Sequence, residues 1–172
     1  TASISAAMGT TSWFDFGGSE VASSFAASVK DLSLLLRQEE TLVGASRVVV
    51  AGFSQGGVLS YHFGLTRVGT PLGGVAALST FLRKEETQAF VQSSCMTPVL
   101  ICHGTEDDRI PGGAQGAERA RDELSRLGLT DVELKIYEGL GHSASEEELC
   151  DVLLWLRRVV PKESTTAPNA KL

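Results

Sequence analysis

The stretch that decides the fold is RVVVAGFSQGG, residues 47–57. Residues 47–52 are β-branched and apolar on both faces, which is typical of a buried parallel strand. The next segment, GFSQG at 52–56, matches G-x-S-x-G, and a helix is predicted over 55–66. A strand that enters this motif and a helix that leaves it enclose a tight turn, which presents Ser54 at the head of the helix.

Further strands and helices alternate on both sides of this stretch. We expect strands over 74–79, 98–102 and 132–137, and helices over 19–42, 83–91, 112–127 and 145–160. A helix followed by four strand–helix units predicts an α/β fold with a parallel sheet and helices on both faces. Ligands of such sheets bind at the carboxyl ends of the strands.

The first and the last of these helices have apolar faces that are predicted to pack on the core. The apolar positions of the first helix are Val21, Phe25, Val29, Leu32, Leu35 and Leu36, spaced by three and four. Those of the last helix are Leu149, Val152, Leu153, Leu156 and Val160, after a capping box of Ser145 and Glu148. Residues 1–18 show no periodicity and are predicted to be a loop whose aromatic side chains, Trp13, Phe14 and Phe16, pack onto the domain.

Length and charge limit the classes of protein that fit. The 172 residues suit one domain over 1–161, followed by a polar, disordered tail over 162–172. A net charge of −6 argues against a nucleic-acid partner. No apolar run approaches the roughly 18 residues of a membrane span, and no signal peptide opens the chain. We therefore expect a cytoplasmic protein without a transmembrane segment.

The cysteines and the first residue add two expectations. Cys95, Cys102 and Cys150 form no C-x-x-C pair, so the sequence indicates neither a zinc site nor a disulfide framework, and buried reduced thiols are predicted. The chain starts with Thr1, and its first methionine is Met8, so we expect a fragment of a longer protein.

Three predicted strand ends carry candidate catalytic groups. Ser54 follows the first strand, HGTEDDRIP at 103–111 follows the third, and EGLGHS at 138–143 follows the fourth. The chain order of serine, aspartate and histidine is that of α/β-hydrolases. In such a site a carboxylate orients the histidine, which removes the proton of the serine.

Some of these groups have competitors. His62 follows Ser54 by eight residues on one helix, about 12 Å along its axis, so it cannot be the base and is expected to pack or lie at the surface. His103 precedes the acidic residues and is expected to tether their loop by hydrogen bonds. Asp107 and Asp108 are adjacent, and chemistry alone does not separate them.

Together these motifs resemble the acyl-protein thioesterase/lysophospholipase group of the phospholipase–carboxylesterase family. The matching stretches are SWFD at 12–15, GFSQGG at 52–57, ALS at 77–79, CHG at 102–104 with Asp107 and Pro111, and YEG at 137–139 with His142 and Ser143. They extend over nearly the whole chain outside its ends. The resemblance implies an α/β-hydrolase that cleaves carboxylic esters or thioesters without metal or cofactor. Its substrates would be S-acylated proteins, lysophospholipids or simple esters.

The resemblance also assigns roles to single residues. It implies Ser54 as nucleophile, Asp107 rather than Asp108 as acid, and His142 as base, with Gln55 supplying one backbone N–H to the oxyanion hole. Phe81 stands where these enzymes often have a tryptophan beside the acyl channel. Trp13 is expected in a loop near the site.

The departure from the family lies ahead of SWFD, where the family has strands, a helix and an H-G-x-G loop with a second oxyanion donor. Loss of one donor lowers the rate by roughly 10²–10³. Loss of strands would leave residues 47–52 as a bare apolar edge, so we expect the chain alone to fold poorly.

The alternatives to an active hydrolase are a catalytically impaired form or a binding protein of the same fold. A dienelactone hydrolase-type enzyme ranks lower, because that branch usually employs a cysteine nucleophile.

Overall fold

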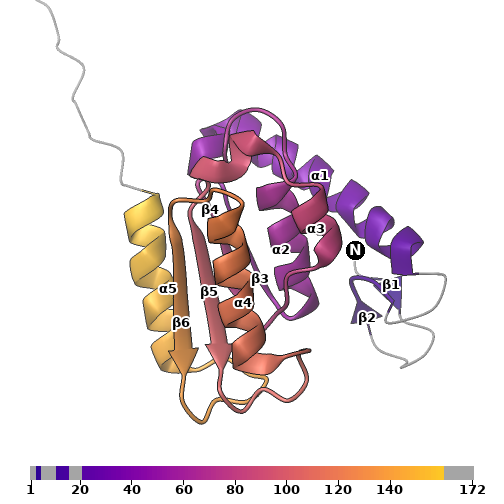
Figure 1. The fold of residues 1–172 in the computed structure, drawn as a ribbon. Helices are drawn as coiled ribbons and strands as arrows, with labels where there is room; N and C mark the ends of the chain where they lie inside the picture. Colours follow the sequence, from indigo (N-terminus) through magenta and orange to yellow (C-terminus); the bar gives the residue numbers. More distant parts are fainter. Residues whose placement is uncertain (1–2, 5–10, 16–20, 161–172) are drawn as a thin grey trace, which may run out of the picture.

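A parallel four-stranded sheet forms the centre of the computed structural model, which describes residues 3–4, 11–15 and 21–160. Its strands are β3 (Val49–Phe53), β4 (Gly74–Leu78), β5 (Val99–Gly104) and β6 (Val132–Tyr137). They pair in that order, with registers such as Gly52 beside Ala77 and Ala77 beside Ile101 (Figure 1). The predicted α/β fold class is confirmed.

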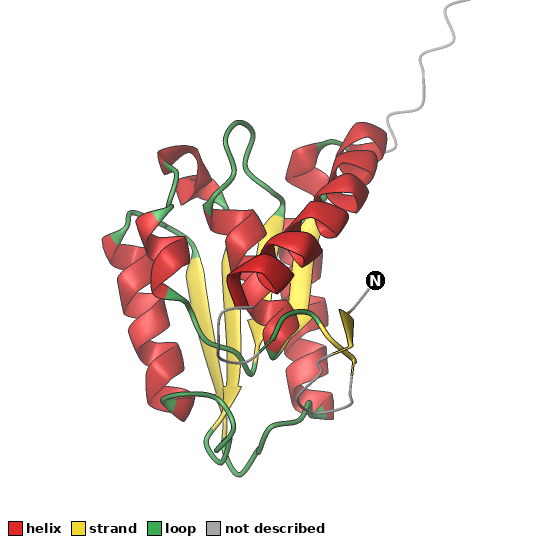
Figure 2. Ribbon diagram, turned by 90° about the vertical axis from the view of Figure 1, so that its right-hand side faces the viewer, coloured by secondary structure: helices red, strands yellow, loops and turns green. Residues whose placement is uncertain are grey.

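Helices cover both faces of this sheet (Figure 2). They are α1 (Val21–Val43), α2 (Gln55–Leu65), α3 (Lys84–Gln88), α4 (Gly113–Arg126) and α5 (Glu146–Val159), with short 3₁₀ turns at Ala45–Arg47 and Gln92–Met96. One buried cluster joins α2 and α4 to the sheet through Tyr61, Val75, Ile101 and Leu124. A second cluster joins α5 to the opposite face through Leu100, Cys102 and Trp155. A third packs α1 against α2.

Two predicted core faces were partly wrong. Leu149 and Leu153 are 50% and 55% exposed, and α5 turns Trp155 inward instead, at 3% exposure. The reason lies in β4, because a Cβ at Gly74 would come within 2.6 Å of the Trp155 ring. The missing side chain makes the space that this indole fills. On α1, Leu35 is likewise exposed, whereas the other predicted positions pack against the core.

The capping box prediction is half fulfilled at the start of α5. The amide of Glu148 donates to Ser145 Oγ at 3.1 Å, as a capping serine requires. Both carboxylate oxygens of Glu148, however, lie buried without a hydrogen-bond partner among the described residues. The reciprocal hydrogen bond from the Ser145 amide to this carboxylate is therefore not formed.

β3 is an edge strand among the described residues. It pairs only with β4 there and is half-buried, with Ala51 exposed, which agrees with the apolar edge predicted at residues 47–52 and not with a strand enclosed on both sides. The first residues differ from expectation. The predicted loop over 1–18 contains a short antiparallel pair, β1 (Ser3–Ile4) with β2 (Thr11–Ser12). Phe16 and the predicted tail over 162–172 lie outside the described residues, so the domain limits stay a prediction.

Three further sequence expectations can be compared with the described residues. Cys102 is buried, Cys95 is only partly buried and Cys150 is exposed, so the prediction of buried thiols was right for Cys102 and wrong for Cys150; all three thiols are free. No group of metal-ligating side chains occurs within 3–4, 11–15 and 21–160. None of the helices described is both long and apolar enough to cross a membrane.

Candidate active site

The turn between β3 and α2 holds Ser54 in a strained conformation. Its φ is 55°, in the left-handed region that non-glycine residues rarely adopt. Two glycines permit the turn: a Cβ at Gly52 would lie 2.2 Å from the Gly56 carbonyl, and one at Gly57 would lie 2.5 Å from Thr80. Such strain is typical of functional turns and agrees with the nucleophile turn predicted from G-x-S-x-G.

Hydrogen bonds hold this turn against β4. The Ser54 amide donates to the Leu78 carbonyl at 2.9 Å, and Thr80 Oγ1 donates to the Ser54 carbonyl at 2.7 Å. The backbone on both sides of the serine is thus anchored, which leaves its hydroxyl as the group that faces the loops at the sheet's carboxyl edge.

His142 joins Ser54 to Asp107. His142 Nε2 lies 3.1 Å from Ser54 Oγ, and His142 Nδ1 lies 2.9 Å from Asp107 Oδ2. These residues are 88 and 35 positions apart in the chain, and each follows a different strand. The structure therefore brings the three sequence-predicted residues into one hydrogen-bonded line.

Asp107, and not its exposed neighbour Asp108, makes these contacts. Its Oδ1 accepts the amides of Arg109 at 3.1 Å and Ile110 at 3.3 Å. Burial alone would raise the Asp107 pKa, but the hydrogen bond and charge of His142 and the two amides outweigh it and lower the pKa. The carboxylate is therefore ionised and able to hold the imidazole by a charge-assisted bond.

The loops that carry the acid and the histidine are tied to each other. Glu106 donates its amide to the Leu140 carbonyl at 3.0 Å, and the Gly139 amide donates to Thr105 Oγ1 at 2.8 Å. A Cβ at Gly104 would lie 2.0 Å from the Leu140 oxygen, so this close approach needs glycine. The spacing between acid and base is thus fixed by the backbone as well as by their side chains.

Gln55 begins α2 directly after Ser54, so its backbone amide has no helical acceptor four residues earlier. Its side chain is buried and bonded to residues near the start of the chain: Oε1 accepts the Trp13 amide at 2.9 Å, and Nε2 donates to the Phe14 carbonyl at 2.7 Å. Trp13 consequently lies beside the turn, where its Nε1 would be 3.8 Å from a Cβ at Gly56.

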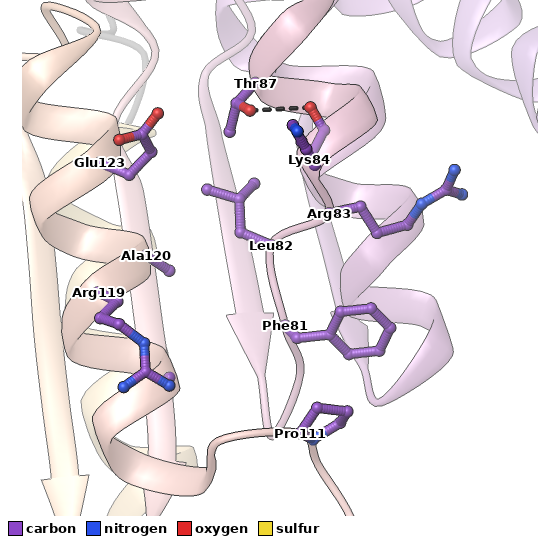
Figure 3. Close-up of a pocket in the computed structure, with 10 residues that line it drawn as sticks. Phe81, Leu82, Arg83, Lys84, Thr87, Pro111, Arg119, Ala120 and Glu123 are labelled. Atoms are coloured by element: carbon purple, nitrogen blue, oxygen red, sulfur yellow. Dashed lines mark hydrogen bonds between the residues drawn. The ribbon is translucent and has the colours of Figure 1, made fainter.

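Phe81 lies between two surface hollows rather than in a closed channel. One hollow, of about 380 Å³, also involves Leu82, Pro111 and α4 (Figure 3). The other, of about 430 Å³, is lined by Phe14 and Val21. Figure 3 shows Phe81 next to Pro111 at one end of the first hollow, whereas Arg83 points away from it. Arg83 instead stacks on Phe25, with its Cζ 4.3 Å from the ring centre.

The remaining histidines differ in their surroundings. His62 packs against the rings of Phe25 and Phe63, with Nδ1 3.5 Å from Glu86, as its predicted packing role requires. His103 is fully buried behind Asp107, but neither ring nitrogen makes a hydrogen bond to a described residue, so the predicted hydrogen-bonded tether is not found there. Phe53, the second residue of G-x-S-x-G, was not predicted to be near the site. Its ring centre lies 4.8 Å from that of His142. An x position in G-x-S-x-G carries no signal for such a contact.

Similarity to curated proteins extends over most of the chain. Acyl-protein thioesterase 1 of Emericella nidulans is 38% identical over 138 residues, which cover 77% of this chain and 56% of that protein. Acyl-protein thioesterase 1 of Gibberella zeae is 34% identical, over 94% of this chain and 74% of that protein. The chain thus spans little more than half the length of the first of these relatives.

Solved structures share the fold. SOBER1 of Arabidopsis thaliana superposes with a TM-score of 0.76 at 29% identity, covering 92% of this chain and 80% of that one. Acyl-protein thioesterase 2 of Zea mays gives 0.66 at 25% identity, over 87% and 73% of the two chains. The model of the phospholipase/carboxylesterase family matches residues 3–160. The chain therefore belongs to the phospholipase/carboxylesterase family, and the resemblance seen in its sequence is confirmed.

Proposed function

We propose that this chain is the catalytic part of a serine hydrolase that cleaves carboxylic esters or thioesters. The observation that carries the proposal is the line from Ser54 Oγ through His142 to Asp107, with distances of 3.1 and 2.9 Å. Both are ordinary hydrogen-bond lengths: the first lets Ser54 give its proton to His142, and the second lets Asp107 orient the imidazole. The relatives named acyl-protein thioesterase support the same chemistry.

In this mechanism, His142 Nε2 removes the Ser54 proton while Oγ attacks the acyl carbon. The Gln55 amide, at the positive end of α2, stabilises the oxyanion. His142 then gives its proton to the departing alcohol or thiol, which leaves an acyl-enzyme. Water, deprotonated by His142, attacks the acyl carbon and releases the acid and Ser54. Asp107 keeps the Nδ1–H tautomer of His142 and stabilises its charged form. The reaction needs no cofactor.

The substrates are proposed from the relatives and the surface. S-acylated proteins fit the relatives' name of acyl-protein thioesterase, and lysophospholipids or simple esters offer the same acyl carbon. Phe81 and Trp13 supply apolar surface for the acyl chain next to the turn, because Phe81 borders both hollows. A cytoplasmic location stays a prediction from the sequence.

Hydrolysis of p-nitrophenyl esters tests this function. Ser54→Ala should lower kcat by at least about 10³-fold, because the nucleophile is lost. Ser60→Ala is the matched control, since Ser60 is a buried serine of the helix that follows Ser54 and its hydroxyl donates to the Gly56 carbonyl. Activity retained in Ser54→Ala would refute the assignment. An inactive but folded wild-type chain would favour the binding-protein alternative.

A further inference from the structure

His103 places a second imidazole against the acid of the site. It stands near the end of β5, is fully buried, and has its Nε2 3.5 Å from Asp107 Oδ2. This is the same carboxylate oxygen that bonds His142 Nδ1 at 2.9 Å. Asp107 thus lies between two histidines, of which the proposed mechanism uses one.

The lone pairs of Asp107 leave one position for this second ring. An ionised carboxylate offers about four acceptor positions. The amides of Arg109 and Ile110 use Oδ1, and His142 uses one position of Oδ2. The fourth position remains for a donor at Oδ2, and His103 Nε2 is the side-chain nitrogen at ion-pair distance from it.

The His103 ring has no other partner among the described residues. Neither ring nitrogen makes a hydrogen bond there, although both are shielded from solvent. A buried polar group without a partner is costly and demands a reason. The contact with Asp107 provides one, because closing 3.5 Å to an ordinary bond length needs a displacement of only a few tenths of an ångström.

His103 can donate a hydrogen bond without taking up the catalytic proton, because its ring stays neutral. Burial lowers the His103 pKa, Asp107 opposes this effect, and the charge of His142 adds to it. The ring therefore stays neutral when His142 becomes protonated. A neutral imidazole still carries one N–H, which can be at Nε2.

We propose that His103 is a positioning residue for the hydrolytic reaction, and this proposal rests on the function proposed above. Its Nε2–H donates to Asp107 Oδ2 and keeps the carboxylate in the orientation that binds His142 Nδ1. The bond matters most when His142 carries the proton from Ser54, since Asp107 then stabilises a full positive charge. His103 itself gains and loses no proton.

Three substitutions separate this role from simple packing. His103→Gln keeps a donor near the position of Nε2, His103→Asn keeps one only near Nδ1, and His103→Leu keeps none. With a soluble p-nitrophenyl ester, we expect His103→Gln to retain kcat within about threefold of wild type. His103→Asn and His103→Leu should lower kcat by about 10- to 100-fold, with KM changed less than about twofold. His62→Asn is the control, because that histidine pairs with Glu86 outside the site.

A proton NMR measurement reports the same bond without catalysis. The His142 Nδ1 proton bonded to Asp107 should keep its downfield resonance in His103→Gln and lose or shift it in His103→Asn. If Asn and Gln behave alike in both kinetics and spectrum, the positioning role is overturned. If the wild-type chain hydrolyses no ester but the resonance still separates Gln from Asn, the function proposal fails while the contact with Asp107 stands.

Discussion

Gln55 Nε2 donates a 2.7 Å hydrogen bond to the carbonyl oxygen of Phe14, a residue 41 positions earlier in the chain. The same side chain accepts the Trp13 amide at 2.9 Å. One amide group therefore satisfies both a donor and an acceptor of an irregular backbone segment. Since Gln55 also begins α2 next to Ser54, the segment around Trp13 is held against the turn that carries the proposed nucleophile.

Removing that side chain should weaken the fold more than an ordinary surface change does. Gln55→Ala removes the acceptor of the Trp13 amide and the donor to the Phe14 carbonyl, so we expect a loss of about 1–3 kcal/mol in the free energy of unfolding. Urea unfolding followed by circular dichroism measures it. Gln88→Ala, at an exposed position of α3, should change this free energy by less than about 0.5 kcal/mol. Equal effects would show that the contacts contribute nothing.

The two glycines of GFSQG should differ sharply in their tolerance of a methyl group. A Cβ at Gly52 would lie 2.2 Å from backbone atoms of Gly56, which cannot move without opening the turn. Outside its own helix, and among the described residues, a Cβ at Gly56 meets only Trp13 Nε1, at 3.8 Å. We expect Gly52→Ala to cost more than about 3 kcal/mol, and Gly56→Ala to fold nearly as the wild type does. Thermal unfolding of both variants checks this, and a stable Gly52→Ala would contradict the steric account.

Glu148 should make stability fall as pH rises. Burial raises the pKa of this fully buried carboxyl group, so its protonated form favours the folded state. That contribution is complete below the ordinary glutamate pKa of about 4.3 and is lost as pH rises through the folded-state pKa. Glu148→Gln cannot ionise. Its free energy of unfolding relative to wild type should therefore increase, by at most about 1.4 kcal/mol per pH unit, above pH 4.3.

The control for Glu148 is its exposed neighbour on the same turn. Glu147→Gln removes a carboxylate at the N-terminus of α5 without changing a buried group. In urea unfolding between pH 4 and 7, the free energy of unfolding of Glu147→Gln relative to wild type should not increase with pH. A Glu148→Gln curve parallel to the wild-type curve would mean that the buried carboxyl group does not titrate between these values.

Local chemistry made some features of this molecule predictable from the sequence. The turn that begins at Gly52 depends on a close approach to the Gly56 backbone that only glycine permits, and these two residues are neighbours in sequence. The alternation of strands and helices likewise predicted a parallel sheet, with the loops that follow its strands at one edge. The turn and the alternation both depend on interactions within about thirty residues, so a pattern along the chain can indicate them.

Contacts between distant segments were not predictable in this way. The inward face of α5 depends on the space that Gly74 leaves for Trp155. The periodicity of a helix does not indicate where a glycine lies on a strand that packs against it. The same holds for Gln55 and Phe14, and for Phe53 against His142. The choice of Asp107 over Asp108 as the acid beside His142 needed either the family resemblance or the structure, because adjacent carboxylates have the same chemistry.

The most direct test of the central claim is the intact mass of the chain after treatment with a fluorophosphonate probe, followed by peptide mapping. If His142 activates Ser54 as proposed, we expect a single adduct on Ser54 that disappears in Ser54→Ala and forms far more slowly in His142→Ala. An adduct that persists in Ser54→Ala, or no adduct on a chain that circular dichroism shows to be folded, would contradict the claim.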